Sequence, residues 1–339
     1  MQSWTPQVAQ AVSPRVGERW KPWPHLTYLI DAIEREMAKP DGRLIVNMPP
    51  RHGKSVTTSH WLPVAFLEAF PRRKVILCSY EHTIAAKWGR KVRDTFLDPS
   101  LSTKVNPKKR SGSNWETTEG GGMRTAGSNG AITGEGFHLG IIDDPTKDWR
   151  DAHSPTLRKH LIDWFESTFY TRAEPGACII VNMTRWHQHD LTGYLLDKHS
   201  DNWTHISLPA VAEEDDQMGR NVGEALCRER YDEAALERIK KASGRKWAGM
   251  HQQRPLPAEG SIIKAHHLRY YDKLPRDVQH VGISVDANFG DTETPGDSSF
   301  VVLQAWGRKD ADYYLLDQIR ERFGFVDTLA ALRSMLERW

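Results

Sequence analysis

The sequence predicts an α/β fold in which a parallel sheet is covered by helices on both faces. From about residue 43 onward, short apolar runs typical of buried strands alternate with helical patterns. Polar residues suited to chemistry follow directly after several of the apolar runs. Because ligands bind at the carboxyl ends of the strands in such sheets, we expect the functional residues there.

Four apolar runs are predicted to be strands of this sheet, at residues 44–46, 74–80, 138–143 and 177–184. Helical patterns are predicted at residues 54–70 (bent at Pro63), 81–96, 155–170 and 190–198. Ser154 is a suitable N-cap for the third of these helices, because Pro155 stands at its first position.

The length of 339 residues favours two domains. From about residue 208 to 257 the strand pattern gives way to loops and two short helices, near 232–242 and 246–254. A linker containing Pro255, Pro257 and Gly260 follows. Three consecutive strands, 278–287, 299–306 and 313–316, and a helix at 326–338 then predict the front part of a second domain.

Composition excludes several classes of protein. Charged residues make up 27% and hydrophobic residues 39%, which is ordinary for a soluble globular protein. No apolar run approaches the roughly 18 residues that span a bilayer, and the start of the chain lacks a secretory signal, so we expect a cytoplasmic protein. The three cysteines form no CxxC pair, which favours buried thiols over metal ligands.

Net charge is only +2, which gives weak support for nucleic-acid binding. Two basic runs, residues 104–110 (KVNPKKR) and 238–246 (RIKKASGRK), either contact phosphates or are solvated surface charge.

A phosphate-binding loop is predicted at residues 47–55 (NMPPRHGKS), between the first strand and a helix. In that setting backbone N–H groups wrap phosphates, Lys54 reaches the β- and γ-phosphate oxygens, and Ser55 ligates Mg²⁺. Met48 stands where the usual pattern has its first glycine. The predicted nucleotide-binding residues of the loop are Pro50, Arg51, His52, Gly53, Lys54 and Ser55.

Two features near the loop allow more than one interpretation. Arg51 is either a group that senses phosphate, which would give it a catalytic role, or a surface arginine. Upstream, residues 20–25 (WKPWPH) either supply an aromatic face for adenine or pack a lead-in segment.

Paired acids end a predicted strand about 90 residues after the loop. In a phosphate-loop enzyme Asp143 would hold Mg²⁺, and Asp144 would activate the attacking water as the catalytic base. The alternative for Asp144 is an Asx turn leading into Pro145. Thr184, after the next strand, either senses the γ-phosphate or belongs to a strand-ending turn. The histidines lack the i, i+4 spacing of a helical zinc site, which argues against a metallohydrolase.

Motifs in a fixed order resemble those of the large terminase subunits of tailed bacteriophages. These are PPRHGKS (49–55), IIDDPTKD (141–148), TRWH (184–187), HDLTGYL (189–195), SLPAVA (207–212) and MHQQRPLP (250–257). The resemblance implies an ATPase domain at 1–258, with a small lid or linker region from about 208, and a partial ribonuclease H-like nuclease domain at 259–339. It further implies that Lys54 and Ser55 bind ATP and Mg²⁺, that Asp143 supports the metal, that Asp144 activates water, and that Thr184 couples hydrolysis to motion.

The same resemblance implies the partners. They are double-stranded DNA, the portal protein and the small terminase subunit, in the host cytoplasm. The chain would act as a homo-oligomeric ring on the portal, which is compatible with a monomer in isolation. An arginine donated to the neighbouring subunit is expected, and the candidates are Arg124, Arg158, Arg172 and Arg185.

The nuclease site is expected to be incomplete in this chain. Asp286 matches the first metal-binding acid of the ribonuclease H type, and Asp297 is a candidate accessory ligand for Mg²⁺ or Mn²⁺. The resemblance places further acids after the helix that here ends at Trp339, whereas Asp317 is interpreted as structural. The alternatives are a DNA helicase or translocase without a packaging role, a non-hydrolysing DNA-binding scaffold regulated by nucleotide, and a standalone nuclease.

Overall fold

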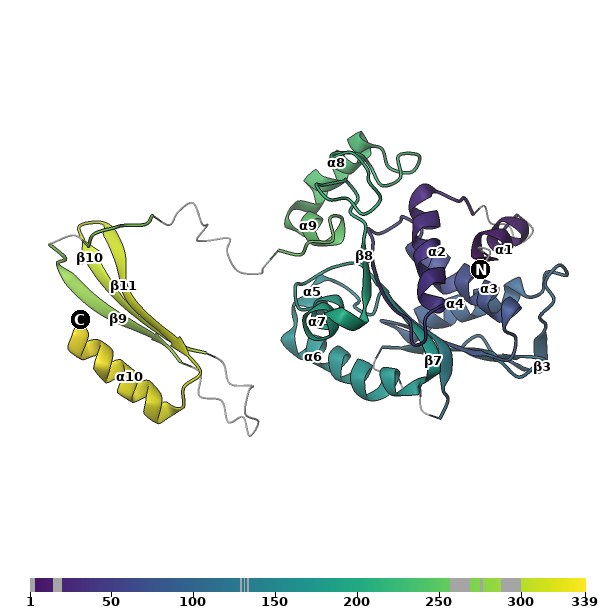
Figure 1. The fold of residues 1–339 in the computed structure, drawn as a ribbon, viewed down its shortest axis with the longest axis horizontal. Coiled ribbons are helices and arrows are strands. Elements are labelled where there is room, and N and C mark those ends of the chain that lie inside the picture. Colours follow the sequence, from purple (N-terminus) through teal and green to yellow (C-terminus); the bar gives the residue numbers. More distant parts are fainter. Residues whose placement is uncertain are drawn as a thin grey trace. The chain divides into compact units, whose positions relative to one another are not determined.

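An eight-stranded sheet forms the centre of the first of two units, Met1–Glu259 and Gly260–Trp339, into which the contacts divide the chain (Figure 1). The computed structural model describes residues 4–14, 20–128, 130, 132, 134–256, 269–274, 277–287 and 300–339. The strand order is β3 (Val105–Arg110), β4 (Asn114–Thr117), β5 (Gly122–Gly127), β2 (Lys74–Ser79), β6 (Phe137–Asp143), β7 (Ala173–Met183), β1 (Arg43–Asn47) and β8 (Thr204–Ser207).

The six strands from β5 to β8 in this order are parallel to their neighbours, whereas β4 and β3 extend the sheet as antiparallel strands. The predicted parallel sheet is therefore confirmed. Strand β7 lies between β1 and β6, so the residues that follow β7 reach the same edge as the phosphate loop and the paired acids.

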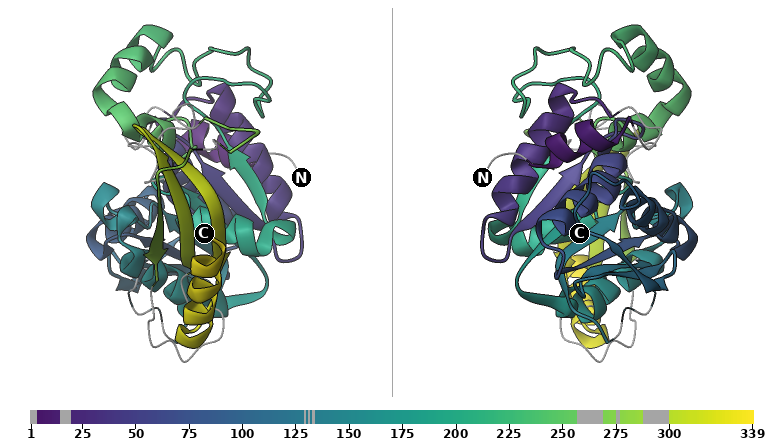
Figure 2. Two further views of the ribbon diagram at one scale, coloured as in Figure 1. Left: turned by 90° about the vertical axis from the view of Figure 1, so that its left-hand side faces the viewer. Right: turned by 90° about the vertical axis from the view of Figure 1, so that its right-hand side faces the viewer.

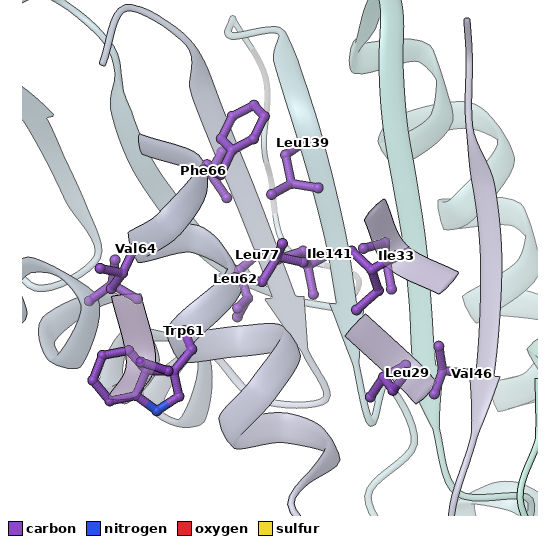
Figure 3. Close-up of a cluster of buried hydrophobic side chains, with 14 of the residues drawn as sticks. Leu29, Ile33, Val46, Trp61, Leu62, Val64, Phe66, Leu77, Leu139 and Ile141 are labelled. Atoms are coloured by element: carbon purple, nitrogen blue, oxygen red, sulfur yellow. The ribbon is translucent and has the colours of Figure 1, made fainter. Parts of the chain in front are cut away.

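Alternating side chains of the central strands fill two separate cores. Leu44 and Val46 of β1 belong to one core, and Ile45 between them belongs to the other. This alternation follows from the two-residue period of a strand. Since both faces are apolar, both must be covered by helices. Figure 3 shows Val46, Leu77 and Ile141 on the first face, with side chains of the helices that cover it.

The first face is covered by α1 (Trp4–Val12), α2 (Pro24–Met37), η1 (Val56–Trp61), α3 (Leu62–Ala69) and α4 (His82–Thr95). The second is covered by α6 (Pro155–Trp164), η2 (Phe165–Phe169) and α7 (Leu191–His199). The short elements α5 (Trp149–His153), η3 (Tyr170–Arg172) and η4 (Ser200–Asn202) complete the connections.

The helix after the phosphate loop is interrupted rather than simply bent. Residues 56–61 form a π-helical stretch, and Pro63 lies near the start of the α-helix that follows. Proline has no N–H to donate to the preceding turn, which explains a change of hydrogen-bond ladder at this point. The Ser154 N-cap is confirmed, because its side chain accepts a hydrogen bond from the Leu157 N–H.

A small subdomain follows β8. It contains α8 (Glu233–Ser243), η5 (Gly244–Lys246) and α9 (Trp247–Met250) around a core of Ala210, Ala225, Leu236 and Trp247. In both views of Figure 2 this green segment stands away from the sheet. The second predicted helix was too long, since α9 ends at Met250 and residues 251–253 form turns.

The second unit contains a three-stranded antiparallel sheet and one helix. The strand order is β11 (Asp312–Glu321), β10 (Val301–Lys309) and β9 (His280–Asp286), and α10 (Phe325–Arg338) packs against the sheet through Met335.

Two further findings concern the cysteines and the lengths of the helices. All three cysteines are buried and free, as expected. None of the helices in the described part of the chain has the length and apolar character needed to cross a membrane.

Candidate functional site

The phosphate loop connects β1 to the helical segment that begins at Lys54. Gly53 has a φ of +89°, and a Cβ atom there would lie 3.2 Å from Leu26. Glycine is required because other residues rarely adopt this backbone conformation. Met48, in the place of the usual first glycine, is fully buried in the core, so it anchors the loop instead of approaching a ligand. Arg51 has a φ of +66° and an exposed side chain.

The loop and the paired acids meet at two short contacts. Lys54 Nζ lies 2.6 Å from Asp144 Oδ2, and Ser55 Oγ donates to Asp143 Oδ1 at 2.9 Å. The partners are about 90 residues apart in the sequence and are brought together by the parallel strands β1 and β6. Lys54 is nearly buried, whereas the Asp144 side chain is 35% exposed. Asp144 is therefore the acid that solvent can reach.

Both the backbone and the side chain of Asp144 are fixed by hydrogen bonds to residues at the end of β7. Its backbone adopts the left-handed region, with a φ of +44°. Its N–H donates to the Asn182 carbonyl at 2.8 Å, and its Oδ1 accepts from the Thr184 N–H at 2.9 Å. The carboxylate is directed at the loop and at β7, so the alternative of an Asx turn into Pro145 does not describe its contacts.

Thr184 lies between the loop and the paired acids. It is buried, its N–H donates to Asp144, and its Oγ1 is 3.5 Å from the Met48 carbonyl oxygen, so it contacts both the loop and the paired acids.

Asn182 is a site residue that the motifs of the sequence did not reveal. Its Nδ2 donates to Asp143 Oδ1 at 2.7 Å and to Thr58 Oγ1 at 3.0 Å. The residue is fully buried on β7, two positions before Thr184. A polar residue inside the buried, apolar part of this strand, residues 177–183, was the available signal, because a buried amide requires hydrogen-bond partners.

Burial and the neighbouring Asp144 carboxylate raise the pKa of Asp143 to about 6, while Lys54 and Ser55 oppose the shift. A buried carboxylate whose charged form is disfavoured gains from a nearby cation. The oxygens of Ser55 and Asp143 converge, and oxygen ligands suit Mg²⁺. These two residues therefore fit the ion that the sequence predicts.

Two buried histidines contact backbone carbonyl groups of the loop. The His25 Nε2 is 2.8 Å from the His52 carbonyl oxygen, and the His52 Nδ1 is 2.9 Å from the Pro50 carbonyl oxygen. Burial lowers the pKa of each ring to about 4, so both are neutral at physiological pH. His52 thus shapes the loop and adds no positive charge to it.

A pocket of about 300 Å³ opens beside Gly53. Trp20 and Trp23 line it, together with Leu26, Val56, Lys21, Lys91 and Arg230. The aromatic residues upstream of the loop therefore border a cavity next to the phosphate loop, where a flat apolar group has room.

The four arginine candidates differ in their surroundings. Arg185 is buried and its Nε contacts both carboxylate oxygens of Asp190, at 3.0 and 2.9 Å. Arg124 lies 3.7 Å from Glu135. Arg158 donates to the Ala152 carbonyl at 2.7 Å, and Arg172 has a buried Nε. Arg185 is the candidate least able to reach a neighbouring molecule.

In the second unit, Asp286 is the exposed last residue of β9. Asp317 contacts Arg338 at 2.9 Å and the Trp339 indole at 3.1 Å. Asp297 lies outside the described residues. Among the described residues no cluster of three or more histidine, cysteine or acidic side chains is arranged to hold a metal ion.

Comparison with known proteins gives one match at the level of a family. The profile described as "Terminase large subunit, T4likevirus-type, N-terminal" matches residues 45–269. No curated protein matches the sequence.

Similar solved structures include the large terminase from a thermophilic bacteriophage. One crystal form aligns over 94% of this chain and 74% of that chain, at 13% identity and a TM-score of 0.42. The same protein in complex with ATP-gamma-S aligns over 89% and 69%, at 12% identity and a TM-score of 0.42. Because the family profile covers more than half of the residues, this chain belongs to the large terminase subunit family.

Proposed function

We propose that this chain is the ATPase of a motor that drives double-stranded DNA into a phage capsid. One observation carries the proposal: Lys54 and Ser55 of a phosphate loop contact Asp144 and Asp143, respectively, at the carboxyl edge of a parallel sheet. Family membership supports the packaging role. The similar terminase of the thermophilic bacteriophage has been solved in complex with ATP-gamma-S and with ADP, the class of nucleotide proposed here.

The geometry suggests how the site works. Backbone N–H groups of the loop and the start of the following helix bind the β- and γ-phosphates of ATP. Lys54 exchanges its ion pair with Asp144 for the phosphate oxygens, which leaves the Asp144 carboxylate free to accept a proton from the attacking water. Ser55 and Asp143 would hold Mg²⁺, which when bound neutralises charge on the phosphates.

Other residues of the site have assigned roles in the proposal. Thr184, which contacts Asp144 and the loop, transmits the state of the γ-phosphate to β7. Arg51 is an exposed residue of the loop and contacts the γ-phosphate. The base of ATP occupies the cavity lined by Trp20 and Trp23.

The wider assembly is proposed from family membership. The chain acts in the host cytoplasm as a ring on the portal protein, and the small terminase subunit and double-stranded DNA are its other partners. The second unit contributes to a genome-cutting nuclease in which Asp286 and Asp297 ligate Mg²⁺ or Mn²⁺. An antiparallel sheet followed by a helix, with Asp286 at a strand end, supports a ribonuclease H-like unit.

The deciding experiment is phosphate release from Mg-ATP by the wild type and Lys54→Ala, with and without long double-stranded DNA. We expect the wild type to hydrolyse ATP, DNA to stimulate this turnover, and Lys54→Ala to abolish it. Turnover that DNA leaves unchanged would argue against a DNA motor. If ATP binds but is not hydrolysed, even when portal protein is added, the chain is a nucleotide-regulated scaffold.

A further inference from the structure

Of the two basic runs in the sequence, the first forms part of a larger cationic surface. Residues Lys108, Lys109 and Arg110 lie on the exposed edge strand β3. Helix α4, which packs on β5 and β2, adds the cations Lys87, Arg90 and Arg93. We call these six residues the α4–β3 surface.

One contact joins α4 to β3 directly, and two more join α4 to the residues that follow β3. Arg93 Nη1 donates to the Arg110 carbonyl at 2.8 Å. The aliphatic part of Arg90 packs closely on Gly112. A Cβ atom added to Gly112 would lie only 2.5 Å from Arg90 Cγ. The buried indole of Trp115, on β4, donates to the carbonyl of Gly89, on α4, at 3.1 Å. Helix α4 therefore packs against β3 and the residues that follow it, which places the cations of α4 and β3 on one surface.

Positive charge on this surface is only partly neutralised. Arg93 pairs with Asp94, and Lys109 pairs with Glu116. Lys87, Arg90, Lys108 and Arg110 are exposed, and within the described ranges no ion pair with an acid involves any of them. Four uncompensated cations on one surface contrast with a net charge of +2 for the whole chain.

Protection of a sheet edge explains only part of this pattern. Lysines and a proline on an edge strand prevent pairing with another chain, and β3 carries Pro107, Lys108 and Lys109. That explanation does not apply to Lys87 and Arg90, which lie on a helix. Spaced three residues apart, they present their charges on one side of α4.

We propose that the α4–β3 surface binds the phosphate backbone of double-stranded DNA, a proposal that rests on the proposed DNA motor. Clustered, exposed lysine and arginine side chains on two joined elements match the repeating charges of a duplex, and contacts from such side chains to phosphates carry no sequence information. Binding is therefore expected to be sensitive to salt and independent of sequence. A motor that moves along any DNA requires the second property.

The second basic run provides a matched control. Arg238, Lys240, Lys241 and Arg245 are exposed on or next to α8. Glu237 lies 3.9 Å from Lys240, and Glu233 belongs to the same helix, so acids are interspersed among these cations. Replacing these four residues removes the same charge as replacing Lys87, Arg90, Lys108 and Arg110.

The test is binding of a 30-base-pair duplex of mixed sequence to the full chain, by fluorescence anisotropy at several salt concentrations. Two fourfold glutamine variants, one for each set of cations, are compared with the wild type. The α4–β3 variant is expected to bind at least tenfold more weakly. The plot of its log affinity against log salt should be less steep. The magnitude of the slope should decrease by about 0.9 for each phosphate that the substituted side chains no longer neutralise. The control variant should retain the wild-type slope.

The possible outcomes distinguish failure of the proposed DNA-binding surface from failure of the proposed DNA motor. Equal affinity and slope in the wild type and the α4–β3 variant would overturn the proposed surface and leave the DNA motor standing. Absence of DNA binding by the wild type, even at low salt, would overturn both. If the variant changes self-association in sedimentation but not DNA binding, the surface is a contact between copies of the chain, and the proposal is wrong. Unchanged thermal unfolding shows that the variants are folded.

Discussion

Asp143 and Asp144 are adjacent residues whose different surroundings suit them to different tasks. Asp143 is buried, contacts Ser55 and Asn182, and has a raised pKa. Asp144 is partly exposed, carries the ion pair with Lys54, and has a left-handed backbone. A buried carboxylate next to a hydroxyl suits a metal ion, and a solvent-accessible one suits proton transfer.

Substituting Asp144 tests that division. Asp144→Asn is expected to bind ATP with near wild-type affinity and to lower turnover by about 10²-fold or more, because an amide cannot accept the proton from water. The measurements are nucleotide binding by calorimetry and phosphate release at saturating ATP. Unchanged turnover would remove Asp144 from the role of base.

Asn182 is expected to act as a positioning residue. Asn182→Ala removes a hydrogen bond to the Asp143 carboxylate, and a hydrogen bond to a charged group contributes about 1.5–3 kcal/mol. The Mg²⁺ concentration for half-maximal turnover should therefore rise about tenfold, with a smaller change in turnover at saturating Mg²⁺. Asn202→Ala, at an exposed position, is the control. Equal Mg²⁺ dependence in both variants would show that Asn182 has no part in positioning Asp143.

At the scale of elements, the ion pair between Arg185 and Asp190 joins the end of β7 to the start of α7. Asp190 is the N-cap of α7 and accepts from the Gly193 N–H, while its carboxylate also accepts from the Trp186 N–H. Arg185 thus compensates a buried charge that organises the turn after Thr184. This role explains an arginine here without a neighbouring subunit.

Arg185→Ala is therefore expected to destabilise the fold. Leaving one partner of a buried ion pair alone costs about 3–5 kcal/mol. Urea unfolding should show this loss, and mixing the variant with Lys54→Ala protein should restore no turnover. Arg158→Ala, at a less buried position, should unfold close to the wild type. A stable Arg185→Ala protein that regains activity on mixing would identify Arg185 as the arginine donated in trans.

At the scale of the whole molecule, several buried histidines link stability to pH. Burial lowers the pKa of His25, His52 and His205 to about 4 and that of His60 to about 3, from an ordinary value of 6.5. Below pH 6.5 the unfolded chain takes up protons that the folded chain excludes, so the free energy of unfolding falls as pH decreases toward 4. Asp143, with a raised pKa, acts in the opposite direction below about pH 6, but it is a single group, and burial also lowers the pKa of His138, His187 and His251.

The thermal unfolding midpoint is therefore expected to fall steadily between pH 7 and pH 5. Each histidine contributes up to about 1.4 kcal/mol for each pH unit within its range. His60→Gln, which removes one such group, should flatten the dependence, whereas His199→Gln at an exposed position should not. A midpoint that is constant from pH 7 to pH 5 would contradict the neutral, buried state of these rings.

Features encoded by neighbouring residues were predictable from sequence alone. The strands β1, β2, β6 and β7 were predicted because each is a continuous apolar run, and the phosphate loop and paired acids were predicted because their residues are contiguous. Four strands of the sheet were missed. β3 is polar, as edge strands often are, β4 and β8 are only four residues long, and β5 contains two glycines and no continuous apolar run.

What the sequence determined by itself is the fold class and the family resemblance, and it predicted Lys54, Ser55, Asp143 and Asp144 as site residues, since each depends on a short local pattern. Only the tertiary structure decided that β7 lies between β1 and β6, and hence that Asn182 reaches Asp143 across 39 residues of sequence. It also decided that Arg185 is buried and that the charges of α4 and β3 form one surface. The physical reason is that strand order and burial depend on contacts between distant segments, which local patterns of hydrophobicity do not encode.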